Sequence, residues 1–359
     1  MAKESNEFIQ ISFCLPVYNV KQYLKPCIDS IYRQNIDSFE IICVDDRSTD
    51  GSYEVLLELR KKIPELIVCR NDKNRGISYT RNVALRKSTG KYIWFVDADD
   101  LLPPDTTEKL LRIAEEKKAE AVLGKLAWFV DGSEPPKDIV DSGVVTPAEF
   151  SKPKTFYSHD QNGMTSFGVW LGIYNNNRGF LVSNDLFFHE ELGPLEECVF
   201  HFETGLKSSR FFLTDTTVYY YRIRERSACY MENEARCRTY FDMCRRVLKI
   251  YENHLQSGCR TNNSVKAHLT DRKEISAVYL VQIPDRKYVE SGLSFLKKEG
   301  YYPYKYDPET AFAHRSAKYK EWIKHYLLPN ELFFWLIYFW FVSVIILKKK
   351  KKKRMQING

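Results

Sequence analysis

The sequence predicts an α/β protein with a mostly parallel sheet, and two observations support this fold class. Short apolar runs alternate with amphipathic stretches over roughly the first 120 residues, as expected of strands that alternate with helices. Acidic residues directly follow two of these runs: Asp45 and Asp46 after the second, and Asp97, Asp99 and Asp100 after the fourth. Since ligands of such sheets bind beyond the carboxyl ends of the strands, both clusters point to a binding site.

The apolar runs are bounded by turn-forming residues, which is typical of buried strands. We expect strands at 11–17, 40–44, 66–70 and 92–96. We expect helices from about Tyr23 and at 51–62, 77–87 and 104–117. After about residue 125 the pattern weakens. A long irregular excursion is expected at 131–166, apolar segments at 169–174 and 210–221, and helices at 234–256 and 271–300.

Length and composition narrow the class of protein. The 359 residues are enough for one large core and an appended lobe. Lys348–Lys353 and Arg354 carry all of the formal net charge of +7, so the rest of the chain is neutral and a nucleic-acid partner is not expected. The nine cysteines form no CxxC pair, which predicts reduced core thiols. The first ten residues show no apolar signal region, so we expect a cytoplasmic working face.

The triplet Asp97-Ala98-Asp99 suits a divalent cation. Side chains alternate along an extended chain, so the two carboxylates lie on the same side. Hard oxygens at this spacing suit Mg²⁺ or Mn²⁺, which take few protein ligands together with the phosphates of a nucleotide. Such a triplet is common by itself. It is informative here because it follows a predicted buried strand and a second acidic strand end lies upstream.

Four motifs in order resemble one known family. They are PVYNV at 16–20, VDDRSTDGS at 44–52, RGISYTRN at 75–82 and GKYIWFVDADD at 90–100. Their order and spacing, across roughly residues 10–125, are similar to family 2 glycosyltransferases. The resemblance implies a GT-A fold, which is a Rossmann-like, mostly parallel sheet flanked by helices. It also implies an inverting reaction and a Mn²⁺ or Mg²⁺ ion that holds the diphosphate of the donor.

The resemblance also implies roles for individual residues. Pro16 and Tyr18 would belong to the wall of the base-binding site, and Asp46 would hydrogen-bond the base, most often uracil. Arg81 would lie near the nucleotide, Asp97 would approach the ribose or the metal shell, and Asp99 would be the metal ligand. The residues by themselves support Asp46, Asp97 and Asp99, whereas Pro16 and Tyr18 equally suit simple packing at a strand end.

The acceptor half departs from the family pattern. The second residue of a Glu-Asp pair normally serves as the base, but this chain has Glu196-Glu197 in PLEECVFHF. We expect Glu197 to deprotonate the acceptor hydroxyl, although its extra methylene moves the carboxylate by about an ångström. An exposed structural acid is the alternative for Glu197. A lone histidine such as His201 is more often structural than a metal ligand.

The C-terminal segment 332–347 has sixteen residues, nearly all apolar, followed by the basic run. As a helix it would span about 24 Å, against roughly 30 Å of hydrocarbon. Because the basic run and the donor site should share the cytoplasmic side, we expect a helix that lies in an anionic membrane surface. A short anchor span and a buried core helix are the alternatives.

These observations lead to one leading hypothesis and two alternatives. The chain is expected to transfer a sugar from a nucleoside diphosphate donor, UDP being the first candidate, to a saccharide or lipid-linked saccharide in cell-surface polysaccharide synthesis. The expected organisation is a donor half (1–125), an acceptor half (126–230), a helical region (231–328) and the membrane-associating tail (329–359). One alternative is a relative without activity that binds nucleotide-sugar or serves as a scaffold at the membrane. A nucleotidyltransferase is disfavoured because PVYNVKQYL contains no glycine-rich basic phosphate loop.

Overall fold

The structure is a computed structural model of the chain. The chain forms two compact units, residues 1–227 and 228–359. The described residues are 9–136, 145–147, 159–160, 163–164, 172–175, 180–192, 195–208, 210–224, 233–258, 276, 279–300, 334–339 and 342.

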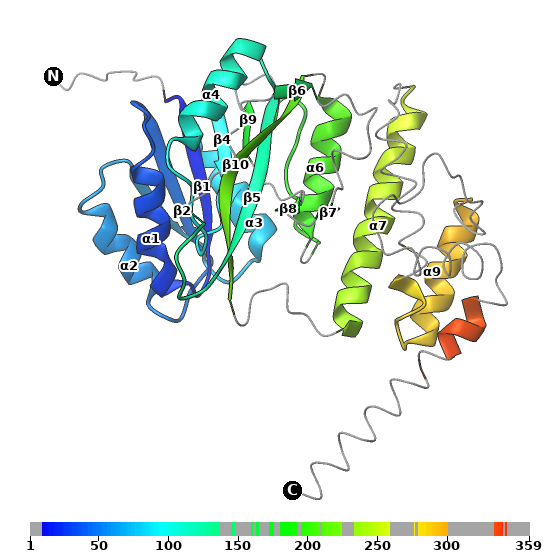
Figure 1. Ribbon diagram of the computed structural model, residues 1–359. Helices are drawn as coiled ribbons and strands as arrows, with labels where there is room; N and C mark the ends of the chain where they lie inside the picture. Colours follow the sequence, from blue (N-terminus) through cyan, green and yellow to red (C-terminus); the bar gives the residue numbers. More distant parts are fainter. Residues whose placement is uncertain are drawn as a thin grey trace, which may run out of the picture. The chain divides into compact units, whose positions relative to one another are not determined.

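The described part of the first unit is built on an eight-stranded sheet (Figure 1). Its strands are β1 (Ile11–Val17), β2 (Phe39–Asp45), β3 (Leu66–Arg70), β4 (Tyr92–Phe95), β5 (Ala121–Val130), β6 (Val145–Pro147), β9 (Gly172–Asn175) and β10 (Phe211–Ile223). They lie in the order β3-β2-β1-β4-β9-β5-β10-β6, and a separate two-stranded sheet pairs β7 (His159–Asp160) with β8 (Gly163–Met164). Strands β1 to β4 are parallel, as is the β5–β10 pair, whereas β9 and β6 are antiparallel to their neighbours. The expected mostly parallel α/β sheet is confirmed.

Helices connect the parallel strands. They are α1 (Lys21–Tyr32), α2 (Ser52–Arg60), α3 (Ile77–Lys87) and α4 (Thr106–Lys117), and a further helix, α6 (Glu196–Lys207), follows later in the chain. The expected helix and strand boundaries in the first 120 residues are confirmed to within two residues. After β3 the chain reverses its direction across the sheet, so right-handed crossovers put α3 on the face opposite α1 and α2.

The strand order fixes where a ligand can bind. Strand β1 lies between β2 and β4, and the chain leaves β1 toward β2 but returns on the other side as β4. Such a reversal opens a crevice at the carboxyl ends of the two central strands. Val17 pairs with Asp45 at that edge, and Asp97 follows β4 two residues after its last residue, Phe95. Both acidic clusters therefore lie beside the same crevice.

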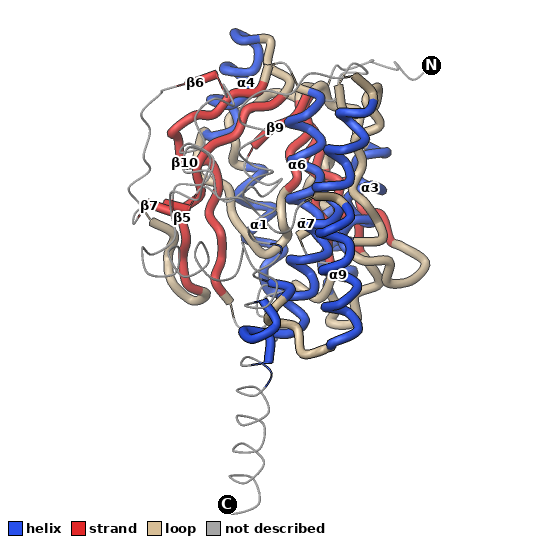
Figure 2. The backbone as a smooth tube through the Cα atoms, turned by 90° about the vertical axis from the view of Figure 1, so that its right-hand side faces the viewer, coloured by secondary structure: helices blue, strands red, loops and turns tan. Residues whose placement is uncertain are grey.

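Strand β9 and helix α6 bring the later part of the chain to this crevice. A Cβ on Gly172 would lie 2.0 Å from the carbonyl oxygen of Val122, so glycine is what lets β9 pair closely with β5. The ring of Phe200 on α6 stacks on Phe188 at 4.3 Å and meets Phe95 of β4 edge-on at 5.7 Å. These buried rings fix the start of α6 near the end of β4. Figure 2 shows α6 and α3 on the same side of the strands.

The described part of the second unit is helical. It contains α7 (Asn233–Gln256), which confirms the expected helix at 234–256, and α9 (Arg286–Lys298). Most of the earlier part of the expected 271–300 helix lies outside the described residues. A helical segment at 334–339 buries Phe334, Ile337 and Tyr338, and the hydroxyl of Tyr338 donates to the Pro284 carbonyl at 3.0 Å.

Most of the expected membrane segment, 329–359, also lies outside the described residues. In the part of the chain that the structure does describe, no helix has the length and apolarity needed to cross a membrane.

Candidate active site

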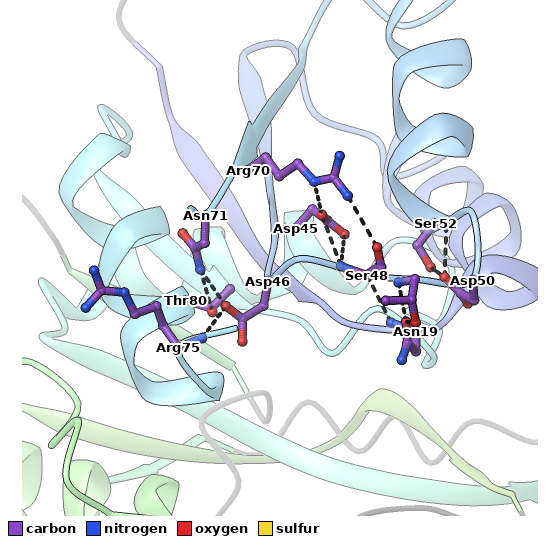
Figure 3. Close-up of polar contacts among 11 residues, drawn as sticks. Asn19, Asp45, Asp46, Ser48, Asp50, Ser52, Arg70, Asn71, Arg75 and Thr80 are labelled. Atoms are coloured by element: carbon purple, nitrogen blue, oxygen red, sulfur yellow. Dashed lines mark hydrogen bonds and ion pairs between the residues drawn. The ribbon is translucent and has the colours of Figure 1, made fainter. Parts of the chain in front are cut away.

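The first acidic strand end is held by a set of hydrogen bonds (Figure 3). Asp45 is fully buried, forms an ion pair with Arg70 at 2.9 Å, and accepts the backbone N–H of Ser48. The side chain of Asn19 accepts the N–H of Thr49 at 2.8 Å, and the N–H of Asn19 donates to Ser48 Oγ. These bonds tie the loop after β1 to the loop after β2, so the two sides of the crevice wall are fixed together.

Asp46 organises the entry to α3. Its carboxylate accepts the side-chain amide of Asn71 and the backbone N–H groups of Arg75 and Gly76, each at 2.8 Å. Gly76 has φ +85° and ψ 168°, a conformation that is essentially restricted to glycine. The predicted role of Asp46 in binding the base remains a prediction, and the structure adds a positioning role for the Arg75–Gly76 turn.

The two other residues predicted for the base-binding wall lie beside these loops. Pro16 is half-buried near the end of β1, and Tyr18 is 49% exposed directly after it. An exposed aromatic ring at a strand end suits stacking on a planar ligand. Their predicted role stays a prediction.

The second acidic strand end lies against β10. The N–H of Asp97 donates to the hydroxyl of Tyr219 at 3.0 Å, and Leu101 forms an antiparallel bridge with Tyr220. Asp100 is buried and accepts the N–H of Arg222 at 2.7 Å. Burial raises the pKa of Asp100 well above its usual range, and the charges of Asp99 and Asp97 add to the effect. These contacts fix residues 97–100, called the acidic turn below, along the end of β10.

Asp99, the predicted metal ligand, is paired with an arginine. Its Oδ2 lies 2.6 Å from Nε of Arg224, the residue directly after β10, and its backbone carbonyl accepts from Nε of Arg222 at 2.7 Å. Burial raises the pKa of Asp99, and Arg224 opposes that effect. The carboxylate that was expected to hold a cation thus already faces a cationic group.

Arg81 joins the acidic turn to the start of α6. Its guanidinium is 2% exposed, with Nη2 2.7 Å from Asp97 and Nη1 in an ion pair with Glu196. The planar fork of arginine suits two carboxylates at once. Arg81 was predicted to lie near the nucleotide, and that role stays a prediction; its guanidinium contacts Asp97 after β4 and Glu196 at the start of α6.

Glu197, the predicted base, lies beside Glu196 in the first turn of α6 and is half-buried. Burial raises the pKa of Glu197 to about 8, and the charge of Glu196 adds to the shift. A carboxyl group with its pKa near the working pH suits general base catalysis. Leu195, the residue directly before α6, has φ +80°, which is rare for a leucine and marks a constrained entry to the helix.

His201 is buried on the same helix, and its ring nitrogen lies 3.1 Å from the hydroxyl of Tyr174. This contact fits the structural role that a lone histidine was expected to have.

The donor set at the acidic turn fits a divalent cation shared with a substrate. Within the described residues no group of three or more His, Cys, Asp or Glu is placed to hold a metal alone. Asp97 and Asp99 are two carboxylates, but each already faces a guanidinium, so a cation at this turn would have to share or replace these partners. Mg²⁺ and Mn²⁺ usually take one or two carboxylates and complete their shell with phosphate oxygens and water.

Arg222 and Arg224 contact the acidic turn but were not predicted from the sequence as parts of the site. The signal was present in YYYRIRERS, where arginines recur at every second position after an apolar strand. Such spacing puts successive arginines on one face of an extended chain. The pairing with Asp99, which is distant in sequence, was not readable from that local pattern.

Comparison with known proteins agrees with this geometry. Residues 12–164 match the model of Glycosyl transferase family 2. A poly(ribitol-phosphate) beta-glucosyltransferase of Bacillus spizizenii is 28% identical over 229 residues, which are 60% of this chain and 32% of that protein. The putative glycosyltransferase EpsH of Bacillus subtilis is 28% identical over 216 residues, 59% of this chain and 60% of that protein. The chain thus spans less than two thirds of the length of these relatives.

Solved structures share the fold. TarS of Staphylococcus aureus in complex with UDP has a TM-score of 0.54 at 21% identity, covering 84% of this chain and 76% of that chain. The complex of TarS with UDP-GlcNAc has a TM-score of 0.55 at 19% identity, covering 83% and 94%. A mannosyltransferase of Pyrobaculum calidifontis with GDP-Man and Mn²⁺ has a TM-score of 0.50 at 15% identity, covering 82% and 83%.

The sheet and its switch point match the GT-A fold of these solved glycosyltransferases. The family match is more specific but covers less than half of the chain: residues 12–164 are similar to Glycosyl transferase family 2.

Proposed function

We propose that this chain transfers a sugar, with inversion, from a nucleoside diphosphate donor to a saccharide or lipid-linked saccharide acceptor in cell-surface polysaccharide synthesis. The observation that carries the proposal is the meeting of two acidic groups across one buried arginine. Asp97 at the end of β4 and Glu196 at the start of α6 share Arg81. Donor-side and acceptor-side carboxylates are thereby held in fixed relation, as a direct displacement between two bound substrates requires.

The residues have distinct roles in this reaction. Pro16, Tyr18 and Asp46 contribute to the wall that receives the nucleotide base, with uracil as the first candidate. The named UDP and UDP-GlcNAc complexes of TarS support a UDP-linked donor. Glu197 accepts the proton of the attacking hydroxyl as the new glycosidic bond forms and the bond to the diphosphate breaks. A divalent cation, Mn²⁺ or Mg²⁺, bound with Asp99 would supply positive charge for the departing diphosphate.

The experiment is calorimetry with UDP-sugars in the presence and absence of Mn²⁺, followed by a transfer or donor-hydrolysis assay. Wild-type protein should bind a UDP-sugar only with the metal, and Asp99→Ala should lose that binding because a site with so few ligands cannot spare one. Equal donor affinity for wild type and Asp99→Ala would refute the metal assignment. Donor binding without measurable transfer or hydrolysis would favour the alternative of a relative that only binds nucleotide-sugar or serves as a scaffold. Glu197, which stands where the family normally has an aspartate, is the feature that supports this alternative.

We also propose that the chain works at the cytoplasmic face of a membrane, bound through its C-terminal segment. The support is the sequence of 332–347 and the basic run Lys348–Lys353 that follows it. In the described part of this segment, Leu336 and Phe339 are 54% and 51% exposed, whereas Phe334 and Tyr338 are buried. Exposed apolar side chains beside a basic run suit an anionic lipid surface.

A further inference from the structure

The ion pair between Arg224 and Asp99 brings a positive charge to the carboxylate that the proposed function assigns to the metal. Nε of Arg224 lies 2.6 Å from Asp99 Oδ2, and both side chains are about one-fifth exposed. The distance is that of a short, charge-assisted hydrogen bond. While Asp99 Oδ2 accepts this bond, the guanidinium of Arg224 occupies the side of that oxygen from which a divalent cation would otherwise bind it.

The neighbouring arginine is fixed in place, which distinguishes it from Arg224. Arg222 donates its backbone N–H to Asp100 at 2.7 Å and its Nε to the Asp99 carbonyl at 2.7 Å, and it pairs with Asp131 at 3.1 Å. Its guanidinium also lies 4.5 Å from the ring of Phe129. These contacts hold the end of β10 against the acidic turn whether or not Arg224 stays on Asp99.

Arg224 is held less tightly. Besides Asp99, its guanidinium faces the ring of Tyr23 at 5.3 Å, and Tyr23 itself donates to Asp131. A long side chain with one carboxylate partner and an aromatic face can leave that partner without a change in the backbone.

We propose that Arg224 is a competing cation: it neutralises Asp99 in the free protein and leaves that carboxylate when a divalent cation binds. The proposal rests on the proposed function, which assigns Asp99 to the metal. It implies that metal alone binds weakly, because Arg224 must first be displaced. Metal that arrives with a nucleotide diphosphate binds more tightly, because the phosphates add ligands that compensate for the displacement. Arg224 thereby lowers the affinity for the metal both with and without a bound nucleotide.

The test is the binding of Mn²⁺ alone, followed by electron paramagnetic resonance, to wild type, Arg224→Met and Arg86→Met. Methionine keeps an apolar stem beside Tyr23 and removes the charge. Arg86 pairs with Glu190 on the surface and gives the same change in net charge away from the acidic turn. We expect Arg224→Met to bind Mn²⁺ roughly 5- to 150-fold more tightly than wild type, the usual range of a coupling between two binding events. Arg86→Met should match wild type.

Two further measurements assign the effect to Asp99 and to the displacement of Arg224 by the metal. The double variant Arg224→Met with Asp99→Asn should lose the tighter binding. Addition of UDP should strengthen Mn²⁺ binding by about the same factor in Arg224→Met as in wild type, because the metal displaces Arg224 whether or not UDP is present. Arg224→Gln provides the same test if the methionine variant has a lowered melting temperature.

Each outcome has one meaning. Mn²⁺ affinity in Arg224→Met and Arg224→Gln that does not exceed that of wild type overturns the proposal, as does an equal gain in Arg86→Met. If wild type binds and transfers from a UDP-sugar, but the Arg224 variants bind Mn²⁺ no more tightly than wild type, only this inference fails. If Arg224→Met binds Mn²⁺ more tightly but wild type neither binds nor turns over any nucleotide-sugar, the proposed function fails and the competition between Arg224 and the metal stands.

Discussion

Two adjacent glutamates at the start of α6 have different surroundings and should behave differently. Glu196 is 2% exposed and shares the buried Arg81 with Asp97, whereas Glu197 is half-buried, has no such arginine partner among the described ion pairs, and has its pKa raised to about 8 by burial. Glu197→Gln should leave donor binding intact and reduce transfer by a factor on the order of 10² to 10⁴, the usual worth of a general base. Glu196→Gln should act mainly on stability, because it weakens a buried charge pair. A larger loss of transfer in Glu196→Gln than in Glu197→Gln would assign the base to Glu196.

The raised pKa of Glu197 also predicts how activity and stability depend on pH. Because the base must be ionised, kcat/KM should rise with pH up to about 8 and then level off. The unfolded glutamate has a pKa of about 4.3, so the folded state binds the proton more tightly. Stability should therefore fall as pH rises from about 4.3 through about 8, and Glu197→Gln should be spared that loss. Thermal melts of both proteins at pH 6 and pH 8.5 measure this; parallel changes in melting temperature would contradict the assignment.

At the scale of elements, the acidic turn after β4 depends on β10. Asp100 accepts the N–H of Arg222 at 2.7 Å, and its pKa is raised by burial, so its neutral form is favoured. Asp100→Asn keeps the acceptor oxygen and should cost little, less than about 1 kcal/mol of unfolding free energy. Asp100→Ala leaves a buried N–H without a partner and should cost about 1–3 kcal/mol. Chemical denaturation of the two variants checks this difference, and equal costs would show that the hydrogen bond contributes nothing.

The same turn shows what the sequence could and could not predict. Strands such as 11–17 and 66–70 and the helix at 77–87 follow from local periodicity and have the predicted bounds. The acidic strand ends Asp45-Asp46 and Asp97-Asp99 follow from that pattern too. The insertion of β9 between β4 and β5 and the pairing of Arg224 with Asp99 depend on contacts between residues far apart in the chain. Local periodicity carries no information on such pairings.

At the scale of the whole molecule, the C-terminal segment has two parts that should respond differently to truncation. The described residues 334–339 bury Phe334, Ile337 and Tyr338, and Tyr338 donates to Pro284 within the same unit. Fully burying such a side chain contributes about 1.5–3 kcal/mol. Removal of 329–359 should therefore destabilise residues 228–328, whereas removal of 343–359 leaves these contacts in place.

The shorter truncation tests the membrane proposal without disturbing that packing. Removal of 343–359 deletes the basic run, and each basic residue near an anionic leaflet contributes about 1 kcal/mol at most. The truncated protein should keep the melting temperature and donor affinity of the full chain but bind anionic vesicles far less.

Replacement of Lys348–Lys353 by glutamine should weaken binding to anionic vesicles more than to neutral ones, and salt should reduce the difference because it screens exposed charges. Vesicle co-sedimentation at low and high salt measures both effects. Equal binding of the full chain and the glutamine variant to anionic vesicles would remove the electrostatic part of the proposal, and no binding of the full chain to any vesicle would refute membrane association.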